Sequence, residues 1–307
     1  MAIPSGTLTG TSAISNLVQT AYDQYVRMAL RSIPVMRALA DVKPVQQAMP
    51  GSSVVFSIYS DLAQATSTLT ESTDVSSIAL GNPNQITVTL QEYGSAVTTT
   101  KKLNLTSFND VDAALADIIA YNAADSIDAV VAGVLTSGTN IIYGGTATNT
   151  AGITAGSTIS VSDIRAAVTN LRSNKALPRI GELYAAYLHP KQTADLRAET
   201  GTGGFQDLSK FTDRTPFVAG AVGVLEGAFI VETPRVPFTS NGTTNVYSAI
   251  VAGREALAEA QGQDISTVIG PQIDALRRFH TIGWYYFGGW NILRTAALYQ
   301  IQTSTAY

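Results

Sequence analysis

The sequence predicts an α+β fold, in which helices and strands form separate blocks. Two runs at 54–59 and 86–90 alternate apolar and polar residues, as half-buried strands do. An apolar stripe at helical spacing occupies 109–137, and the chain ends in a segment of alternating aromatic and aliphatic residues. Because these elements do not follow a regular βαβ order, a doubly wound parallel sheet is not expected.

Composition narrows the classes of function. The 307 residues can bury a sizeable core, and 45% hydrophobic content excludes general disorder. Only 14% of residues are charged, against about 25% in an average soluble domain. A surface so poor in charge favours a protein that packs against copies of itself. The net charge of −4 argues against gripping nucleic acid by counterion release, and the lack of cysteine excludes disulfides and thiolate metal sites.

The sequence predicts neither export nor a membrane span. The first ten residues lack the basic and apolar regions of a secretory signal. Asp117, Asp125 and Asp128 interrupt the most apolar run, so we expect no membrane span. The protein is therefore expected to fold in a cytoplasm.

An amphipathic helix is predicted from Ser12 to about Ser32, before Pro34. It can be an arm that packs on a larger body or an ordinary core helix, and the residues leave both possibilities open. Its candidate contact residues are aromatic and basic, namely Tyr22, Tyr25, Arg27 and Arg31.

A long hairpin is the most informative prediction. The strands 54–59 and 86–90 are joined by a polar segment far longer than the two to five residues of an ordinary hairpin loop. Such a ribbon is marginal without a core beneath it, so we expect it to lie on another molecule. A change of alternation near Tyr93 and Gly94 predicts a bulge. The candidate intersubunit contacts are the apolar residues of the hairpin, Phe56, Ile58, Tyr59, Leu62, Leu69, Val75, Ile78 and Leu80.

The longest helix is predicted over Asn109–Ser137, capped by Ser107 or Asn109, with a length of roughly 40 Å. The rest of the chain mixes short strands and helices. We expect strands at 141–143, 183–188, 228–231 and 246–252, helices after Ser162 and from Pro190, a helix or turn at 253–260, and two final strands around Gly288 and Gly289 within 279–301.

No constellation predicts catalysis, a cofactor or a metal site. The two histidines, His189 and His280, fit a helix cap and strand packing better than chemistry. The glycines at 201–204 lack the ending of a phosphate loop. Glu255, Glu259, Asp264 and Asp274 are interpreted as solvated charges. The aromatic residues at 279–290, next to Arg277 and Arg278, could stack single-stranded bases, but packing is the favoured interpretation.

Five segments occur in an order that suggests a family. They are residues 51–56, Glu92-Tyr93-Gly94, 187–190 with Asp195-Leu196-Arg197, 227–236, and Ile282-Gly283-Trp284 through the 303–304 tail. Over nearly the whole chain this set resembles the major capsid proteins of tailed double-stranded DNA bacteriophages with the HK97-type fold. More narrowly, it is similar to the capsid family named after coliphage N4.

The resemblance implies an architecture and a set of partners. It implies an N-arm (1–50), an E-loop (51–94), a P-domain with the spine helix (95–138), an A-domain (139–253), and P-domain strands with the C-terminus (254–307). It also implies a homo-oligomer of hexamers and pentamers that encloses double-stranded DNA without sequence-specific binding. A scaffolding protein, a portal and a decoration protein are the expected partners. The protein would reside in the virion, and in the host cytoplasm during assembly.

One departure from the family pattern concerns stability. The fold's namesake joins an E-loop lysine to an asparagine of a neighbouring subunit, but no lysine lies between Lys43 and Lys101 here. That cross-link is therefore expected to be absent. The alternatives are another assembly subunit, of a tail tube or a surface-layer lattice, and an enzyme such as a Ser/Asp hydrolase using His189; nothing in the sequence favours the enzyme.

Overall fold

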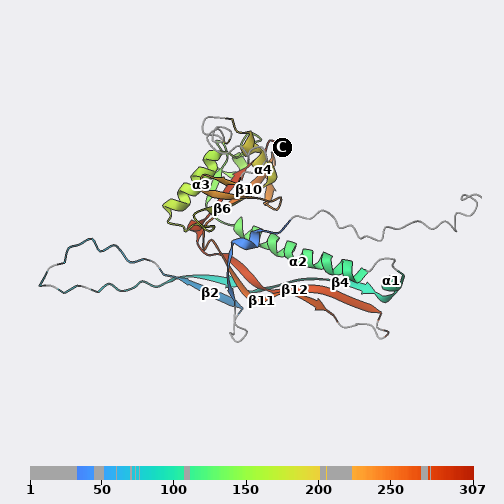
Figure 1. Ribbon diagram of the computed structural model, residues 1–307. Helices are drawn as coiled ribbons and strands as arrows, with labels where there is room; N and C mark the ends of the chain where they lie inside the picture. Colours follow the sequence, from blue (N-terminus) through green and yellow to red (C-terminus); the bar gives the residue numbers. More distant parts are fainter. Residues whose placement is uncertain are drawn as a thin grey trace, which may run out of the picture.

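The computed structural model describes residues 33–44, 52–59, 61–69, 71–72, 74–75, 77–106, 111–200, 205, 223–270, 276 and 278–307. The helix expected at 12–32, the caps Ser107 and Asn109 and the glycine loop at 201–204 lie outside this part of the chain. Within it, two sheets stand one above the other, and a long hairpin projects from the lower sheet (Figure 1).

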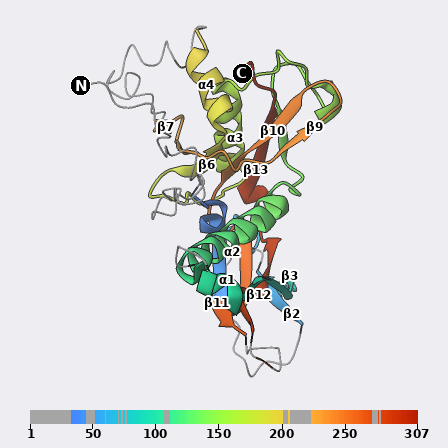
Figure 2. The same cartoon turned by 90° about the vertical axis from the view of Figure 1, so that its right-hand side faces the viewer.

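The lower sheet is long and carries the longest helix. Its strand order is β1-β11-β12-β4, with β1 parallel to β11 and the other pairs antiparallel. The strands are β1 (Ala40–Pro44), β11 (Leu257–Ile269), β12 (Phe279–Ile292) and β4 (Gln91–Thr100). The helix α2 (Val111–Leu135) lies over one face of this sheet (Figure 2). Its apolar stripe packs on Trp284 and Tyr286 of β12. The short α1 (Lys101–Thr106) follows β4.

The upper sheet is formed by shorter strands in the order β5-β13-β10-β6-β8-β7, with β9 paired to β10. Its members are β5 (Ile141–Tyr143), β13 (Leu298–Thr303), β10 (Asn245–Ala252), β6 (Tyr184–Leu188), β8 (Ala228–Glu232), β7 (Val224–Leu225) and β9 (Phe238–Ser240). The helices α3 (Val161–Ser173) and α4 (Pro190–Ala198) cover it and enclose a second core around Ile164, Leu171 and Leu188. Short 3₁₀ turns are η2 (Met36–Leu39), η3 (Thr150–Gly152) and η4 (Thr295–Ala297).

The predicted α+β class is confirmed, and so are most individual elements. The strands expected at 141–143, 183–188, 228–231 and 246–252 match β5, β6, β8 and β10 within a residue or so. The helix at Pro190 also forms, and His189 caps it as expected. The cap of α3 was predicted two residues too late, because Ser160 rather than Ser162 occupies the N-cap.

One prediction near the end of the chain holds only in part, and another is wrong. Residues 253–260 were expected to form a helix or turn; a turn forms at Arg254 and Glu255, but Leu257 already begins strand β11. All of 257–260 are buried, so the alternation that identifies a half-buried strand is missing. Gly288 and Gly289 were expected to separate two strands, but β12 runs through both of them. The expected bulge at Tyr93 and Gly94 is also absent, because β4 and β12 pair in unbroken register.

The predicted domain ranges differ from the sheets at two places. Strand β1 lies in the lower sheet, although residues 1–50 were assigned to an arm. Strand β13 pairs with β10 in the upper sheet, although 254–307 were grouped with the lower one. Both strands are short and bonded to partners more than 40 residues away in sequence, so local patterns do not reveal their sheet.

We expected no segment with the length and apolar composition of a membrane span, but α2 has both. Among the described helices, Leu115–Leu135 is long and apolar enough to cross a membrane by length and composition. Core helices of soluble proteins meet the same criteria, and this helix carries a fully buried, bonded Asp128.

Candidate assembly surface

The predicted hairpin forms with its strands in register. β2 (Ser53–Ile58) and β3 (Asn84–Thr89) pair antiparallel from Ser53–Thr89 to Ile58–Asn84. The Leu90 N–H also donates to the Ser52 carbonyl at 2.8 Å, which closes the base of the ribbon. The ribbon is therefore held by a complete backbone ladder over its inner length.

The base of the hairpin has a small core beneath it, which the sequence did not predict. Val88 and Leu90 are buried against Ala258 and Ala260 of β11, with Phe56 packed against them. The Lys43 ammonium lies 5.0 Å from the centre of the Phe56 ring. The base of the hairpin is thus packed on its own subunit. The prediction that the hairpin has no core beneath it is wrong for this part.

Gly289 makes that docking possible. A Cβ atom on Gly289 would overlap the carbonyl oxygen of Thr89, since β3 crosses β12 at this point. Asn291, two residues further, donates from Nδ2 to the Thr87 carbonyl at 2.9 Å. A glycine inside a strand marks such a close approach of another backbone, which explains why the chain keeps one here without a turn.

Beyond Tyr59 the hairpin leaves its subunit. The described part of the connection between β2 and β3 extends away from both sheets (Figure 1). Its large apolar side chains are exposed, from 57% for Leu62 to 77% for Leu69. The exposed members of the predicted contact set are Tyr59, Leu62, Leu69, Val75, Ile78 and Leu80, whereas Phe56 and Ile58 are half-buried near the root. We call residues 59–83 the outer segment.

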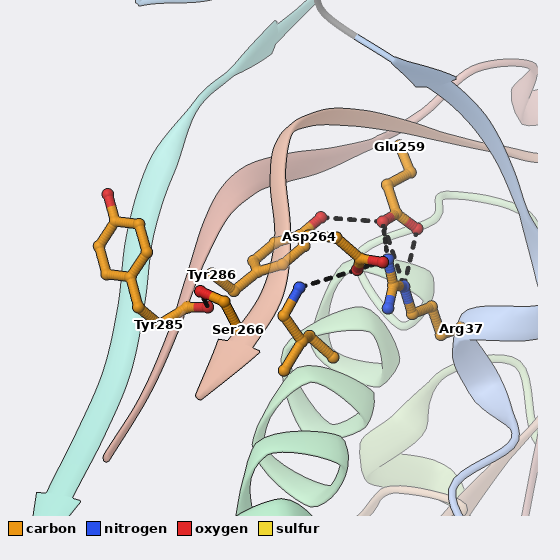
Figure 3. A network of polar contacts seen from close by, with 7 residues as sticks. Arg37, Glu259, Asp264, Ser266, Tyr285 and Tyr286 are labelled. Carbon is orange, nitrogen blue, oxygen red and sulfur yellow. Dashed lines mark hydrogen bonds and ion pairs between the residues drawn. The ribbon is translucent and has the colours of Figure 1, made fainter. Parts of the chain in front are cut away.

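A buried ion pair fixes the chain just before β1. Arg37 donates from Nε and Nη2 to Glu259, with the shortest distance 2.6 Å, and Tyr286 donates its hydroxyl to the same carboxylate at 2.8 Å (Figure 3). The Glu259 side chain is fully buried. Burial lowers the pKa of Arg37, but the hydrogen bond and charge of Glu259 outweigh it, so the pKa is raised. Burial, followed by Glu259, raises the pKa of Tyr286 far above its usual range.

A second buried carboxylate joins three parts of the fold. Asp128 of α2 accepts the Met36 N–H at 2.6 Å and the Arg235 Nε at 2.7 Å. Arg235 belongs to the loop after β8 of the upper sheet and also pairs with Asp125. The Asp128 carboxylate therefore connects the long helix, the segment 33–39 and the upper sheet. Its hydrogen bonds and its ion pair with Arg235 offset the cost of burying the charge.

Sequence reasoning missed both of these networks. Glu259 was interpreted as a solvated charge, but it is enclosed between β1 and β12. The available signals were Asp128 within an apolar helical stripe and Glu259 within an apolar strand. Tyr22, Tyr25, Arg27 and Arg31 lie outside the described residues, so their predicted contacts stay predictions.

The remaining candidates for chemistry have structural roles. The Nδ1 atom of His189 accepts the Lys191 N–H at 3.1 Å, and burial followed by the charge of Lys191 lowers the pKa of His189. Trp284, Tyr286 and Trp290 of the aromatic segment are buried in the core, in agreement with the interpretation that these residues serve packing. No group of three metal-binding side chains occurs within the described residues.

Comparison with known proteins decides the family. A model of the family described as "Phage capsid protein" matches residues 11–294. The chain belongs to this family. No curated protein sequence matches it. The protein is thus a structural subunit of a phage capsid and part of the virion, and the narrower similarity to the coliphage N4 family stays a prediction.

Solved capsids show the same fold over the whole capsid protein. A capsid of cyanophage P-SCSP1u is 18% identical with a TM-score of 0.74, covering 99% of this chain and 97% of that one. A capsid of Ralstonia phage GP4 is 16% identical with a TM-score of 0.73, covering 98% of each chain. The capsid of a native GTA particle is 17% identical with a TM-score of 0.70, covering 97% and 100%. The HK97-like fold is confirmed.

Proposed function

We propose that this capsid protein assembles into hexamers and pentamers of an icosahedral head that encloses double-stranded DNA. The observation that carries the proposal is the outer segment, whose apolar side chains are exposed and extend away from both sheets. Burying such surface on a neighbouring copy stabilises the contact by about 25 cal/mol per Å². Each subunit gives one segment and receives another, so the contact is heterologous and can close a ring.

The domain assignment follows the sheets. The lower sheet with α2 is the P-domain, and the upper sheet, including β13, is the A-domain. The hairpin is the E-loop, and the chain before η2 is the N-arm that braces an adjacent subunit. The ion pair of Arg37 and Glu259 ties η2, which follows this arm in the sequence, to strand β11.

The shell is stabilised without lysine cross-links from the E-loop. No lysine lies between Lys43 and Lys101, so the E-loop has no side-chain amine to donate. Either non-covalent contacts between subunits or a separate decoration protein supplies the stability. A separate scaffolding protein and a portal complete the assembly, which takes place in the host cytoplasm.

Electron microscopy of the protein expressed together with its phage's head-assembly proteins tests the proposal. Closed shells built of hexamers and pentamers are expected, and a denaturing gel of these shells should show only the monomer band. Tubes or flat lattices would favour a different assembly subunit. Monomers or dimers alone, at concentrations where other capsid proteins form shells, would contradict the proposal.

A further inference from the structure

A hollow lies where the chain passes between the two sheets. Three connections line it: the end of α3 at 174–177, the β10–β11 turn at Arg254 and Glu255, and the stretch 294–297 after β12. The Arg254 N–H donates to the Leu177 carbonyl at 2.8 Å, which ties two of these connections together. The volume is about 280 Å³, at the small end of the roughly 300–1,000 Å³ of ligand sites.

The hollow is positively charged in an acidic protein. Lys175, Arg254 and Arg294 line it against the single carboxylate of Glu255. Arg294 pairs with Glu255 at 2.7 Å. In the described part of the chain, the side chains of Lys175 and Arg254 have no carboxylate partner within ion-pair distance. Two cations at one hollow are therefore available to an anion.

The backbone at the hollow favours this interpretation. Lys175 has a φ of 57° and closes α3, since the Ala176 N–H donates to the Leu171 carbonyl and the Lys175 N–H to the Arg172 carbonyl. Glycine is the usual residue at this position of a helix end. Here a lysine stands in its place and brings a second cation to the hollow.

The outer segment has the complementary composition. From residue 44 to residue 100 the chain has four acidic residues and no basic one. Asp61, Glu71 and Asp74 are exposed on the outer segment, between its exposed apolar side chains. The hollow offers the matching apolar surface, because Leu177 in its lining is 61% exposed. The outer segment extends away from its own body, so its partner surface belongs to a second copy (Figure 1).

We infer that the acidic outer segment of one subunit docks at the cationic hollow of a second copy, with carboxylates paired to Lys175 and Arg254. The inference rests on the proposed function and names the surface that receives the hairpin. It makes the contact dependent on salt, since ion pairs at an exposed interface are screened as ionic strength rises.

Charge exchange tests the inference. One variant carries Lys175→Glu with Arg254→Glu, another carries Asp61→Lys, Glu71→Lys and Asp74→Lys, and a third combines all five. Each of the first two should lower the yield of shells by about tenfold at roughly 0.05 M salt, and the combination should restore most of it. The control Lys101→Glu with Lys191→Glu changes the net charge as the first variant does, at exposed sites elsewhere, and should assemble normally.

Two outcomes would overturn the inference and leave the proposed function standing. One is normal shells from both single-set variants. The other is a combined variant as defective as its parents while circular dichroism shows a folded subunit. Failure of the wild-type chain to form shells would instead count against the proposed function itself.

The absence of cysteine allows a direct distance test. Shells of a variant with Val75→Cys and Leu177→Cys, which keeps Lys175, Arg254 and the three carboxylates, are treated with a short bismaleimide and should give a ladder of linked subunits on a denaturing gel. Pairing Leu177→Cys with Leu62→Cys or Ser72→Cys covers other registers of the contact. No ladder from any of the three pairs would overturn the inference.

Discussion

The Nη2 atom of Arg37 lies 2.6 Å from Oε1 of Glu259, although 222 residues separate the two in sequence. The pair joins the segment before β1 to the strand that runs beside it. The Tyr286 hydroxyl donates a further hydrogen bond to the Glu259 carboxylate. The turn η2 is therefore fixed to β11 through one buried carboxylate that is fully hydrogen-bonded.

Removing Arg37 should destabilise the subunit strongly. Arg37→Ala leaves the fully buried Glu259 carboxylate without its counter-charge, at a cost of about 3–5 kcal/mol. Because Arg37 is partly exposed, water reaching the site brings the expected loss to the lower end of this range. Denaturant unfolding of the unassembled subunit measures it. Arg165→Ala, which removes an exposed pair with Glu226, is the control, and an equal loss in both variants would contradict the prediction.

Adding a side chain at Gly289 should loosen the root of the hairpin. Gly289→Val places methyl groups where the Thr89 carbonyl lies, and overpacking of this kind costs about 1–3 kcal/mol. Limited proteolysis should then cut within 84–90 faster than in the wild type. Gly81→Ala is the matched control, because a Cβ there meets nothing within 4 Å. Unchanged cleavage of the Gly289 variant would show that β3 does not need this close approach.

The stability of the upper sheet should fall in mild acid through His189. The neutral Nδ1 accepts the Lys191 N–H, and the pKa of His189 is lowered from 6.5, first by burial and then by Lys191. A lowered pKa in the folded state gives stability that is present above pH 6.5 and is lost as the pH falls through the folded value. The cap contributes about 1 kcal/mol. Unfolding measured from pH 7.5 to pH 5 should show the loss, and His189→Asn should reduce the slope.

The exposed apolar residues of the outer segment should matter for assembly and not for folding. Replacing Leu62, Leu69 and Ile78 by serine removes surface that contacts no core of its own subunit, so the free energy of unfolding should change by less than about 0.5 kcal/mol. The yield of shells should fall severalfold, as measured by sedimentation. A matched variant replaces the exposed Val224 and Phe229 of the upper sheet by serine. It tests whether loss of apolar surface elsewhere lowers the yield of shells equally.

The sequence by itself determined the elements whose pattern is local. Alternation in 54–59 and 86–90 predicted the hairpin, and the apolar stripe within 109–137 predicted the long helix. The length of the hairpin connection predicted a surface for contact with another molecule, and that contact stays a prediction. These signals need no knowledge of distant residues, because each repeats within a few positions of the chain.

Only the tertiary structure decided which segments meet. Buried residues 257–260 show no period, since both faces of β11 are covered there, and Gly288-Gly289 signals a turn as readily as a crossing strand. The pairing of Arg37 with Glu259 and of Asp128 with Arg235 joins residues over 100 positions apart. Such contacts arise when whole elements pack against one another. Glu259, interpreted from the sequence as a solvated charge, is for this reason a buried residue that joins η2 to the lower sheet.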